Sequence, residues 1–296
     1  MDTFPTSLVP LAGGDSGETF LAEAAGEQTV VRVYGPRSAH RGPLAPEIDA
    51  AVLELVRGLV PVPEVLEVRR ADLDADQPGL LVVSRLPGER LDLLLPTLQD
   101  EQLARVGTAL GTLAGRLGHM VQPRPGVFTD RSLALAAPPR EQNDLLSWID
   151  FHAGRLGSSL VEDLRDVADD AQDLLDLDRR ACLVHSDLNA ENLLVDPETL
   201  EVTGVLDWEL ARSGLRWTDL GTLLRLNRHP VLVETVLAAY TAFMPRVPDD
   251  LLDRARAADL FALVELAARQ DATEVVVRAR EQLQAIADTG DLHALP

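Results

Sequence analysis

The polar residues of greatest chemical interest lie in one short segment and just after it. Asp187 precedes Asn192 by five positions, and Asp207 follows beyond two apolar stretches. A carboxylate can orient an attacking hydroxyl group or accept its proton, while other carboxylate and amide oxygens can hold Mg²⁺ against nucleotide phosphates. The three side chains therefore predict phosphoryl transfer, with Asp187 as the catalytic residue and Asn192 and Asp207 as metal ligands.

Short apolar stretches on either side predict the strands that position these side chains. Residues 181–184 form one stretch, and residues 192–195 and 202–206 are typical of a hairpin. Turn or capping roles would explain Asp187 and Asn192 singly. Their order and spacing favour the catalytic interpretation of the set, whereas His185 is interpreted as a structural residue.

This arrangement resembles the aminoglycoside phosphotransferase family, which shares the protein kinase fold, over about residues 8–288. Asp187 matches the family's catalytic aspartate, and Asn192 and Asp207 match its two metal-binding positions. The resemblance implies an α+β, protein-kinase-like, two-lobed fold with a small, mostly antiparallel β N-lobe and a larger, mainly helical C-lobe. It also implies ATP or GTP as phosphoryl donor and Mg²⁺ as cofactor.

Two departures separate the chain from protein kinases. Ser186 stands where those enzymes usually have arginine, and Trp208-Glu209 stands where they have Phe-Gly. The sequence also contains no Ala-Pro-Glu segment to close an activation loop. A protein kinase regulated by phosphorylation is therefore not expected.

The hydrophobic pattern changes near Pro87-Gly88, which predicts an N-lobe over residues 1–86 and a C-lobe over 87–296. The N-lobe is expected to contain strands at 18–24, 28–34, 64–69 and 80–84 and a helix at 46–59. The C-lobe is expected to contain helices from Thr97, at 144–156, 161–175 and 218–226, and from 249 to 288 with breaks. Thr97 and Asp100 are expected to cap the first of them.

Several N-lobe residues are candidates for nucleotide binding. Gly14, Ser16 and Gly17 belong to a glycine-rich segment whose backbone N–H groups could approach phosphate, although a plain hairpin turn explains it equally well. Strand alternation puts Val30 and Arg32 on one face. The family resemblance implies that Val30 contacts adenine and that Arg32 binds the α- and β-phosphates, whereas a surface strand position is the alternative for Arg32.

The resemblance also implies an acidic partner for Arg32 on the helix at 46–59. Its spacing favours Asp49 over Glu47, and either residue could instead be a solvated helix position. Residues 81–86, which include Ser84, resemble the strand and hinge that bind the nucleotide base through backbone groups.

The 48 acidic and 27 basic residues give a net charge of −21, which disfavours nucleic acid and anionic membrane surfaces as partners. Solubility explains this charge as well as attraction of a cationic substrate does. The single cysteine, Cys182, excludes an internal disulfide. The absence of a signal-peptide pattern and of an apolar run of about 20 residues predicts a cytoplasmic protein without a membrane span.

The expected activity is therefore that of a small-molecule kinase. Relatives of this kind act on aminoglycosides, macrolides, other antibiotics, amino alcohols and sugar metabolites. A positively charged acceptor is one alternative, because Glu209, Glu141 and Asp144 lie near segments expected to border the acceptor. The competing interpretations are a nucleotide-binding pseudokinase with a regulatory or scaffold role and a helical interaction domain with accidental motifs.

Overall fold

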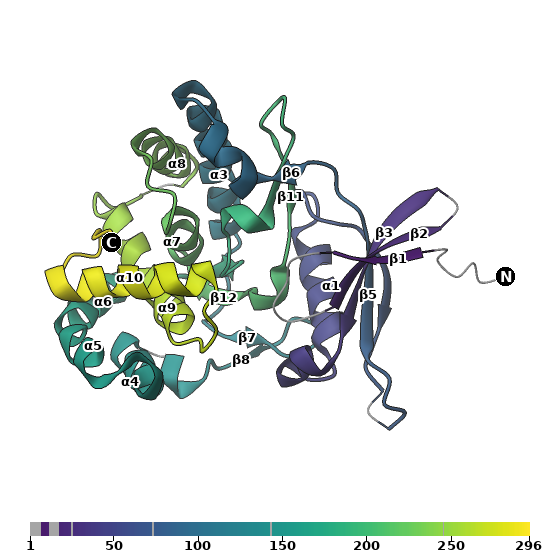
Figure 1. The fold of residues 1–296 in the computed structure, drawn as a ribbon, viewed down its shortest axis with the longest axis horizontal. Helices are drawn as coiled ribbons and strands as arrows, with labels where there is room; N and C mark the ends of the chain where they lie inside the picture. The colour runs from purple at the N-terminus through teal and green to yellow at the C-terminus, as the bar shows by residue number, and fades with distance from the viewer. Residues whose placement is uncertain (1–6, 12–17, 25, 73, 143, 245) are drawn as a thin grey trace.

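The computed structural model of the protein describes residues 7–11, 18–24, 26–72, 74–142, 144–244 and 246–296. An antiparallel sheet with strand order β1-β2-β3-β5-β4 forms one end of the molecule, and helices form the other (Figure 1). Helix α1 (Ala45–Val56) lies between this sheet and the helical part. The five strands are β1 (Ser7–Pro10), β2 (Glu18–Ala24), β3 (Glu27–Tyr34), β4 (Val65–Arg69) and β5 (Gly79–Ser84).

The central pair of this sheet, β3 and β5, is rich in valine and leucine, whose side chains pack well on a pleated surface. Val30 lies opposite Val83, and Arg32 lies opposite Leu81. Gly26, with a φ of +83°, allows the tight connection between β2 and β3. The sheet predicted from the sequence is thus confirmed, and the predicted lobe boundary at residues 86–87 falls between β5 and β6 (Glu89–Arg90).

One hydrophobic core extends through both parts of the molecule, and most of its residues belong to the helical part, which contains three small sheets. No helix of the described residues combines the length and apolar character needed to cross a membrane. The helices are α2 (Leu91–Leu94), α3 (Asp100–Gly118), α4 (Leu145–Leu156), α5 (Ser158–Asp163), α6 (Arg165–Asp176), α7 (Thr218–Leu224), α8 (Pro230–Phe243), α9 (Leu251–Ala267) and α10 (Glu274–Thr289). The strands are β6, β7 (Val127–Phe128), β8 (Leu135–Ala136), β9 (Ala181–Val184), β10 (Leu193–Val195), β11 (Val202–Val205) and β12 (Arg212–Leu215).

Several features differ from the sequence prediction. The helix expected at 161–175 is divided into α5 and α6 at Leu164. Helices α2 and α8 and strands β6, β7, β8 and β12 were not predicted. Helix α8 packs closely on α3 because glycines of α3 leave room for its backbone. The cap of α3 is Gln99, which forms a capping box with Gln102, while the Thr97 hydroxyl donates to Leu94 O at 2.7 Å instead.

The strands that surround the predicted catalytic segment, residues 185–192, belong to two different sheets. The hairpin β10–β11 forms as predicted and pairs with β6 on its other side. Strand β9, which leads into the catalytic segment, pairs with β12. The chain therefore passes from β9 through the segment into β10, and from β11 through Asp207 into β12.

Candidate active site

The side chain of Asp219, on α7, anchors the start of the predicted catalytic segment that follows β9. The two carboxylate oxygens of Asp219 accept hydrogen bonds from the backbone N–H groups of His185 and Ser186, each at 2.9 Å. Ser186 has a φ of +69°, a left-handed conformation that a residue other than glycine adopts only when its surroundings impose it. Asp219 is buried, and burial raises its pKa. The side chain thus supports the segment and does not cap α7.

His185 joins the predicted catalytic segment to Leu206, the residue between β11 and Asp207. Its Nε2 lies 2.8 Å from Leu206 O, which can only accept, so Nε2 carries the proton. Its Nδ1 accepts a hydrogen bond from the N–H of Asp187 at 3.3 Å. The ring also packs on Trp208, with centroids 4.6 Å apart. These contacts support the structural role predicted for His185.

Two amide side chains orient the carboxylate of Asp187. Asn189 Nδ2 donates to Oδ1, and Asn192 Nδ2 donates to Oδ2, both at 2.9 Å. Asn192 Nδ2 also donates to the carbonyl oxygen of Asp187 at 2.9 Å. The carboxylate of Asp187 is therefore held in one orientation from which it can accept a proton.

The hairpin brings Asn192 and Asp207 together although fifteen positions separate them. Leu193 pairs with Val205, and the N–H of Leu206 donates to Asn192 O at 2.8 Å. Asp207 follows directly with φ and ψ of 58° and 62°, a left-handed conformation that is costly for an aspartate. Such strain at a polar position is common at functional sites.

The donor atoms left by these contacts suit a magnesium ion. The amide nitrogen of Asn192 is bound to Asp187, so its carbonyl oxygen Oδ1 is the end left for a cation. Asp207 uses Oδ1 for an ion pair, which leaves Oδ2. Mg²⁺ in phosphoryl-transfer sites is typically held by one or two side-chain oxygens together with phosphates and water. Asn192 and Asp207 fit that requirement.

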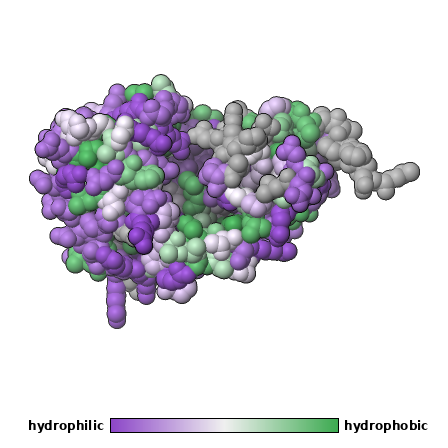
Figure 2. Space-filling view, turned by 90° about the horizontal axis from the view of Figure 1, so that it is seen from below, coloured by the Kyte–Doolittle hydropathy of each residue, from purple (hydrophilic) through white to green (hydrophobic). Residues whose placement is uncertain are grey.

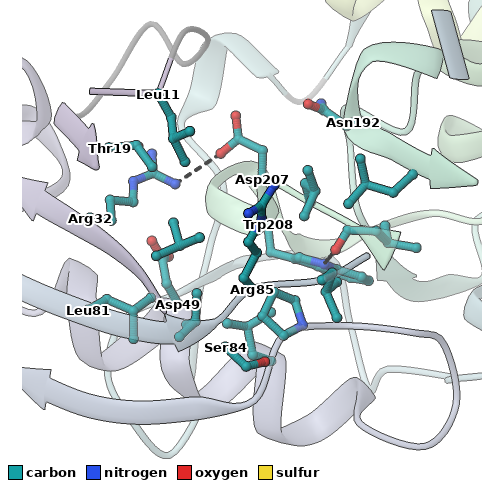
Figure 3. Close-up of a pocket in the computed structure, with 18 of the residues that line it drawn as sticks. Leu11, Thr19, Arg32, Asp49, Leu81, Ser84, Arg85, Asn192, Asp207 and Trp208 are labelled. Atoms are coloured by element: carbon teal, nitrogen blue, oxygen red, sulfur yellow. Dashed lines mark hydrogen bonds and ion pairs between the residues drawn. The ribbon is translucent and has the colours of Figure 1, made fainter. Parts of the chain in front are cut away.

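Arg32 extends from β3 toward the end of the hairpin (Figure 3). Its Nη1 lies 3.0 Å from Asp207 Oδ1, and its Nη2 pairs with Glu209. Burial opposes the charge of Arg32, but Asp207 and Glu209 outweigh burial and raise its pKa. Arg32 therefore remains a cation at the edge of the predicted metal site.

The position of Asp49 differs from the expected pairing. Its carboxylate accepts hydrogen bonds from Arg41 Nη1 at 2.8 Å and from the Tyr34 hydroxyl at 2.6 Å, while the described ion pairs of Arg32 are with Asp207 and Glu209. Arg41, in the 3₁₀ turn Pro36–Arg41, is the arginine that the fold places against Asp49.

The other candidate, Glu47, is also engaged elsewhere, because it pairs with the exposed Arg70 at 2.8 Å. Tyr34 and Arg41 were missed by sequence reasoning. Tyr34 lies two positions after Arg32 on the same face of β3, which was an available signal. No sequence signal pointed to Arg41, because its contact with Asp49 depends on how the turn after β3 folds back.

A cavity of about 380 Å³ lies between the sheet and the hairpin, in the range of ligand-binding sites. Figure 2 shows a hollow between the two parts of the molecule with apolar surface along it. The described lining includes Val30, Arg32, Asp49, Ser84, Asn192 and Asp207, whereas Asp187 is not among its lining residues. The fold thus brings six of the predicted site residues to one cavity.

Three predicted residues, Gly14, Ser16 and Gly17, lie outside the described residues. Ser84 lines the cavity, but its N–H donates to Glu64 O and its hydroxyl accepts from Glu64 N, both at 2.9 Å. Both groups are therefore already bonded within the protein.

Two of the three carboxylates expected near an acceptor are engaged within the protein. Glu209 pairs with Arg32 and lies 3.7 Å from Arg41 Nη1. Asp144 caps α4 by accepting hydrogen bonds from the N–H and hydroxyl of Ser147, each at 2.8 Å. These carboxylates therefore hold the protein together, and they give little support to a cationic acceptor.

Comparison with known proteins agrees with this geometry. An aminoglycoside 3'-phosphotransferase of Streptomyces fradiae is 30% identical over 208 residues, which are 66% of this chain and 70% of that protein. The GDP complex of an aminoglycoside 2'-phosphotransferase-IIIa mutant has a TM-score of 0.70 at 18% identity and covers 99% of this chain and 94% of its own. A microcompartment-associated aminopropanol kinase has a TM-score of 0.68 at 20% identity, and the match covers 95% of this chain and 91% of that kinase. These structures show that the chain has the predicted two-lobed, protein-kinase-like α+β fold.

A family model described as "Phosphotransferase enzyme family" matches residues 7–260, which include β1 to β12 and most of α9. The matched range contains the anchored catalytic segment, the hairpin and Arg32. The chain belongs to the phosphotransferase enzyme family and is a small-molecule phosphotransferase.

Proposed function

We propose that this phosphotransferase transfers the γ-phosphoryl group of ATP or GTP to a hydroxyl group of a small molecule with the help of Mg²⁺. The observation that carries the proposal is the contact between Asn192 and Asp187 at the end of a hairpin that also places Asp207 beside Asn192. The predicted proton acceptor is thereby bonded to one of the two predicted metal ligands, and both of these ligands line the cavity.

Each residue has a separate task in this reaction. Asp187 orients the acceptor hydroxyl and accepts its proton, and Asn192 and Asp207 supply oxygens to the metal. When bound, Mg²⁺ neutralises charge on the phosphates of the nucleotide. Arg32 turns from Asp207 toward the α- and β-phosphates, and Asp49 acts on the nucleotide through Arg41. Residues 1–86 carry the nucleotide, and residues 87–296 carry the metal ligands and the acceptor.

The proposal is tested with two donor bases and with several acceptor classes. Because a structural relative was solved as a GDP complex, GTP is a candidate phosphoryl donor as well as ATP. The relatives named above include aminoglycoside phosphotransferases and an aminopropanol kinase, so antibiotics and amino alcohols are the first acceptors to test.

The test measures nucleotide consumption by the purified chain with ATP and with GTP, with and without Mg²⁺. The acceptors are aminoglycosides, macrolides, amino alcohols, hydroxy amino acids and sugars, and phosphorylated product is identified by mass spectrometry. We expect one acceptor class to stimulate Mg²⁺-dependent consumption that Asp187→Asn abolishes. Nucleotide binding without turnover for any acceptor would contradict the proposal and favour a pseudokinase.

A further inference from the structure

One oxygen atom of Glu209 lies between two arginines. Oε2 of Glu209 pairs with Arg32 Nη2 and lies 3.7 Å from Arg41 Nη1. Glu209 belongs to the 3₁₀ turn Trp208–Leu210, which follows Asp207, and its side chain is 12% exposed. A carboxylate with so little access to water is costly unless a cation contacts it. The structure thus gives Glu209 a close partner on β3 and a second cation within ion-pair distance.

Arg41 is bound to helix α1 through Asp49. Its Nη1 donates to Asp49 Oδ2 at 2.8 Å, and its Nη2 donates to Oδ1. Each Nη atom of a guanidinium carries two hydrogens, so Nη1 can donate to Glu209 while it stays bonded to Asp49. The separation of 3.7 Å exceeds the length of a hydrogen bond by less than about 1 Å. A small movement of Arg41 would therefore complete a second contact without breaking the first.

Arg32 has a different partner set in the proposed reaction from the one in the structure. Its Nη1 lies 3.0 Å from Asp207 Oδ1 (Figure 3), and its Nη2 pairs with Glu209. Nucleotide phosphates would draw the guanidinium away from both carboxylates. Asp207 would then face the metal ion, whereas Glu209 would lose the cation in contact with it. This loss would coincide with the entry of further negative charge into the cavity.

We propose that Arg41 is a positioning residue for the nucleotide, because it replaces Arg32 as the partner of Glu209 when Arg32 turns to the phosphates. Arg41 lowers the cost of releasing Arg32 and acts on the phosphates only through it. It also ties α1, through Asp49, to the 3₁₀ turn after Asp207, which α1 already contacts. This inference rests on the proposed function, in which Arg32 binds the α- and β-phosphates.

A purely structural role of Arg41 would involve Asp49 and not Glu209. Asp49 is buried and also accepts a hydrogen bond from the Tyr34 hydroxyl at 2.6 Å, so loss of Arg41 would disturb the start of α1 in either case. In a structural role, this disturbance would be the same whether residue 209 is charged or neutral. An exchange of partners requires the charge of Glu209. A double-mutant cycle between Arg41 and Glu209 therefore separates the two roles.

The experiment measures binding of ATP and of GTP by calorimetry, with Mg²⁺, to the wild type, Arg41→Met, Glu209→Gln and the double variant. We expect Arg41→Met to raise the Kd for nucleotide about 10- to 100-fold, the value of a charge-assisted hydrogen bond. Glu209→Gln should bind nucleotide at least as tightly as the wild type, because a neutral amide competes less for Arg32. In the Glu209→Gln background, Arg41→Met should change the Kd by less than about twofold.

Arg70→Met is the matched control, because Arg70 is an exposed arginine that pairs with Glu47 of the same helix at 2.8 Å. It should leave the Kd for nucleotide unchanged. Arg41→Lys should keep part of the affinity because the charge remains. Since Arg41 acts on the nucleotide and not on the acceptor hydroxyl, Arg41→Met should raise the KM for nucleotide with little change in kcat at saturating nucleotide.

The possible outcomes separate this inference from the proposed function. Equal losses of nucleotide affinity from Arg41→Met in both backgrounds would overturn the exchange of partners and leave the phosphoryl transfer standing. Weaker nucleotide binding by Glu209→Gln would also overturn it, and this single variant decides the matter if Arg41→Met does not fold. Coupling between Arg41 and Glu209 without turnover of any acceptor would support the inference and contradict the phosphoryl transfer. Failure of the wild type to bind either nucleotide would contradict both.

Discussion

Arg32 Nη1 lies 3.0 Å from Asp207 Oδ1, so the cation expected to bind nucleotide phosphates is paired with a predicted metal ligand. The contact joins β3 of the sheet to the segment after β11, across the cavity. Mg²⁺ and a nucleotide would compete with this ion pair, because the metal binds Asp207 and the phosphates attract Arg32. Binding of the two ligands should therefore be coupled through one side-chain movement.

Substitutions at Arg32 and at Asp207 should differ in their effects on nucleotide affinity and on the Mg²⁺ dependence of the rate. Arg32→Ala should raise the KM for nucleotide by roughly tenfold or more while the Mg²⁺ dependence stays, since the loss of a charge-assisted contact costs about 1.5–3 kcal/mol. Arg32→Lys should retain part of the affinity because the charge remains. Asp207→Ala should instead raise the Mg²⁺ concentration needed for half-maximal rate. Titrations of Mg²⁺ and nucleotide test this, and an unchanged nucleotide affinity in Arg32→Ala would assign the phosphates to another cation.

Asp187→Asn should remove the proton acceptor while preserving the shape of the side chain. Turnover should fall by about 10²-fold or more, the usual contribution of general-base catalysis. Nucleotide binding, measured by calorimetry, should persist because Asn192 and Asp207 remain. Near-normal turnover in this variant would exclude Asp187 from the chemical step.

Asp219→Ala should lower both stability and turnover, because it leaves two backbone N–H groups of the catalytic segment without acceptors. We expect a loss of at least about 2 kcal/mol in the free energy of unfolding. Asp219→Asn keeps one carbonyl oxygen and should lie between this variant and the wild type. Urea unfolding and kcat provide the measurements, with Asp169→Ala on the exposed face of α6 as the control. Equal effects of Asp219→Ala and Asp169→Ala would refute the anchoring role.

Gly88 occupies a position in the connection between the two parts that no side chain fits. Its φ is +113°, and a Cβ placed on it would overlap Thr203 Oγ1 and lie 2.9 Å from Val195 O. Gly88→Ala should therefore destabilise the protein by more than about 1 kcal/mol. Gly154→Ala, in α4 where a Cβ meets no atom within 4 Å, should stabilise it by about 0.5–1 kcal/mol. Thermal unfolding of both variants would show whether the signs differ.

Cys182 should be unreactive in the folded protein. It is buried, its thiol donates to Gly118 O at 2.9 Å, and burial raises its pKa to about 11. At pH 8 only about one thiol in a thousand would be ionised, and the thiolate is the reactive form. Labelling with a thiol reagent should therefore proceed at the rate of unfolding, increase with urea, and slow when nucleotide is added. Rapid labelling of the native protein would contradict this account.

The sequence alone predicted the candidate set of Asp187, Asn192 and Asp207 and determined much of the fold. These three residues could be proposed because their spacing is local and the strands around them have a clear apolar pattern. The sheet strands and most helices followed from periodicity for the same reason. Helix α8 was missed, since its packing on α3 depends on glycines more than a hundred positions earlier in the chain.

Only the tertiary structure decided which charges meet. Asp49 pairs with Arg41, and Glu209 pairs with Arg32, although all four residues are visible in the sequence. Ion pairing depends on distances of a few ångströms and on burial, and both arise when segments far apart in the chain pack together. In a chain with 48 acidic residues, sequence order does not indicate which of them will lie within reach of a given arginine.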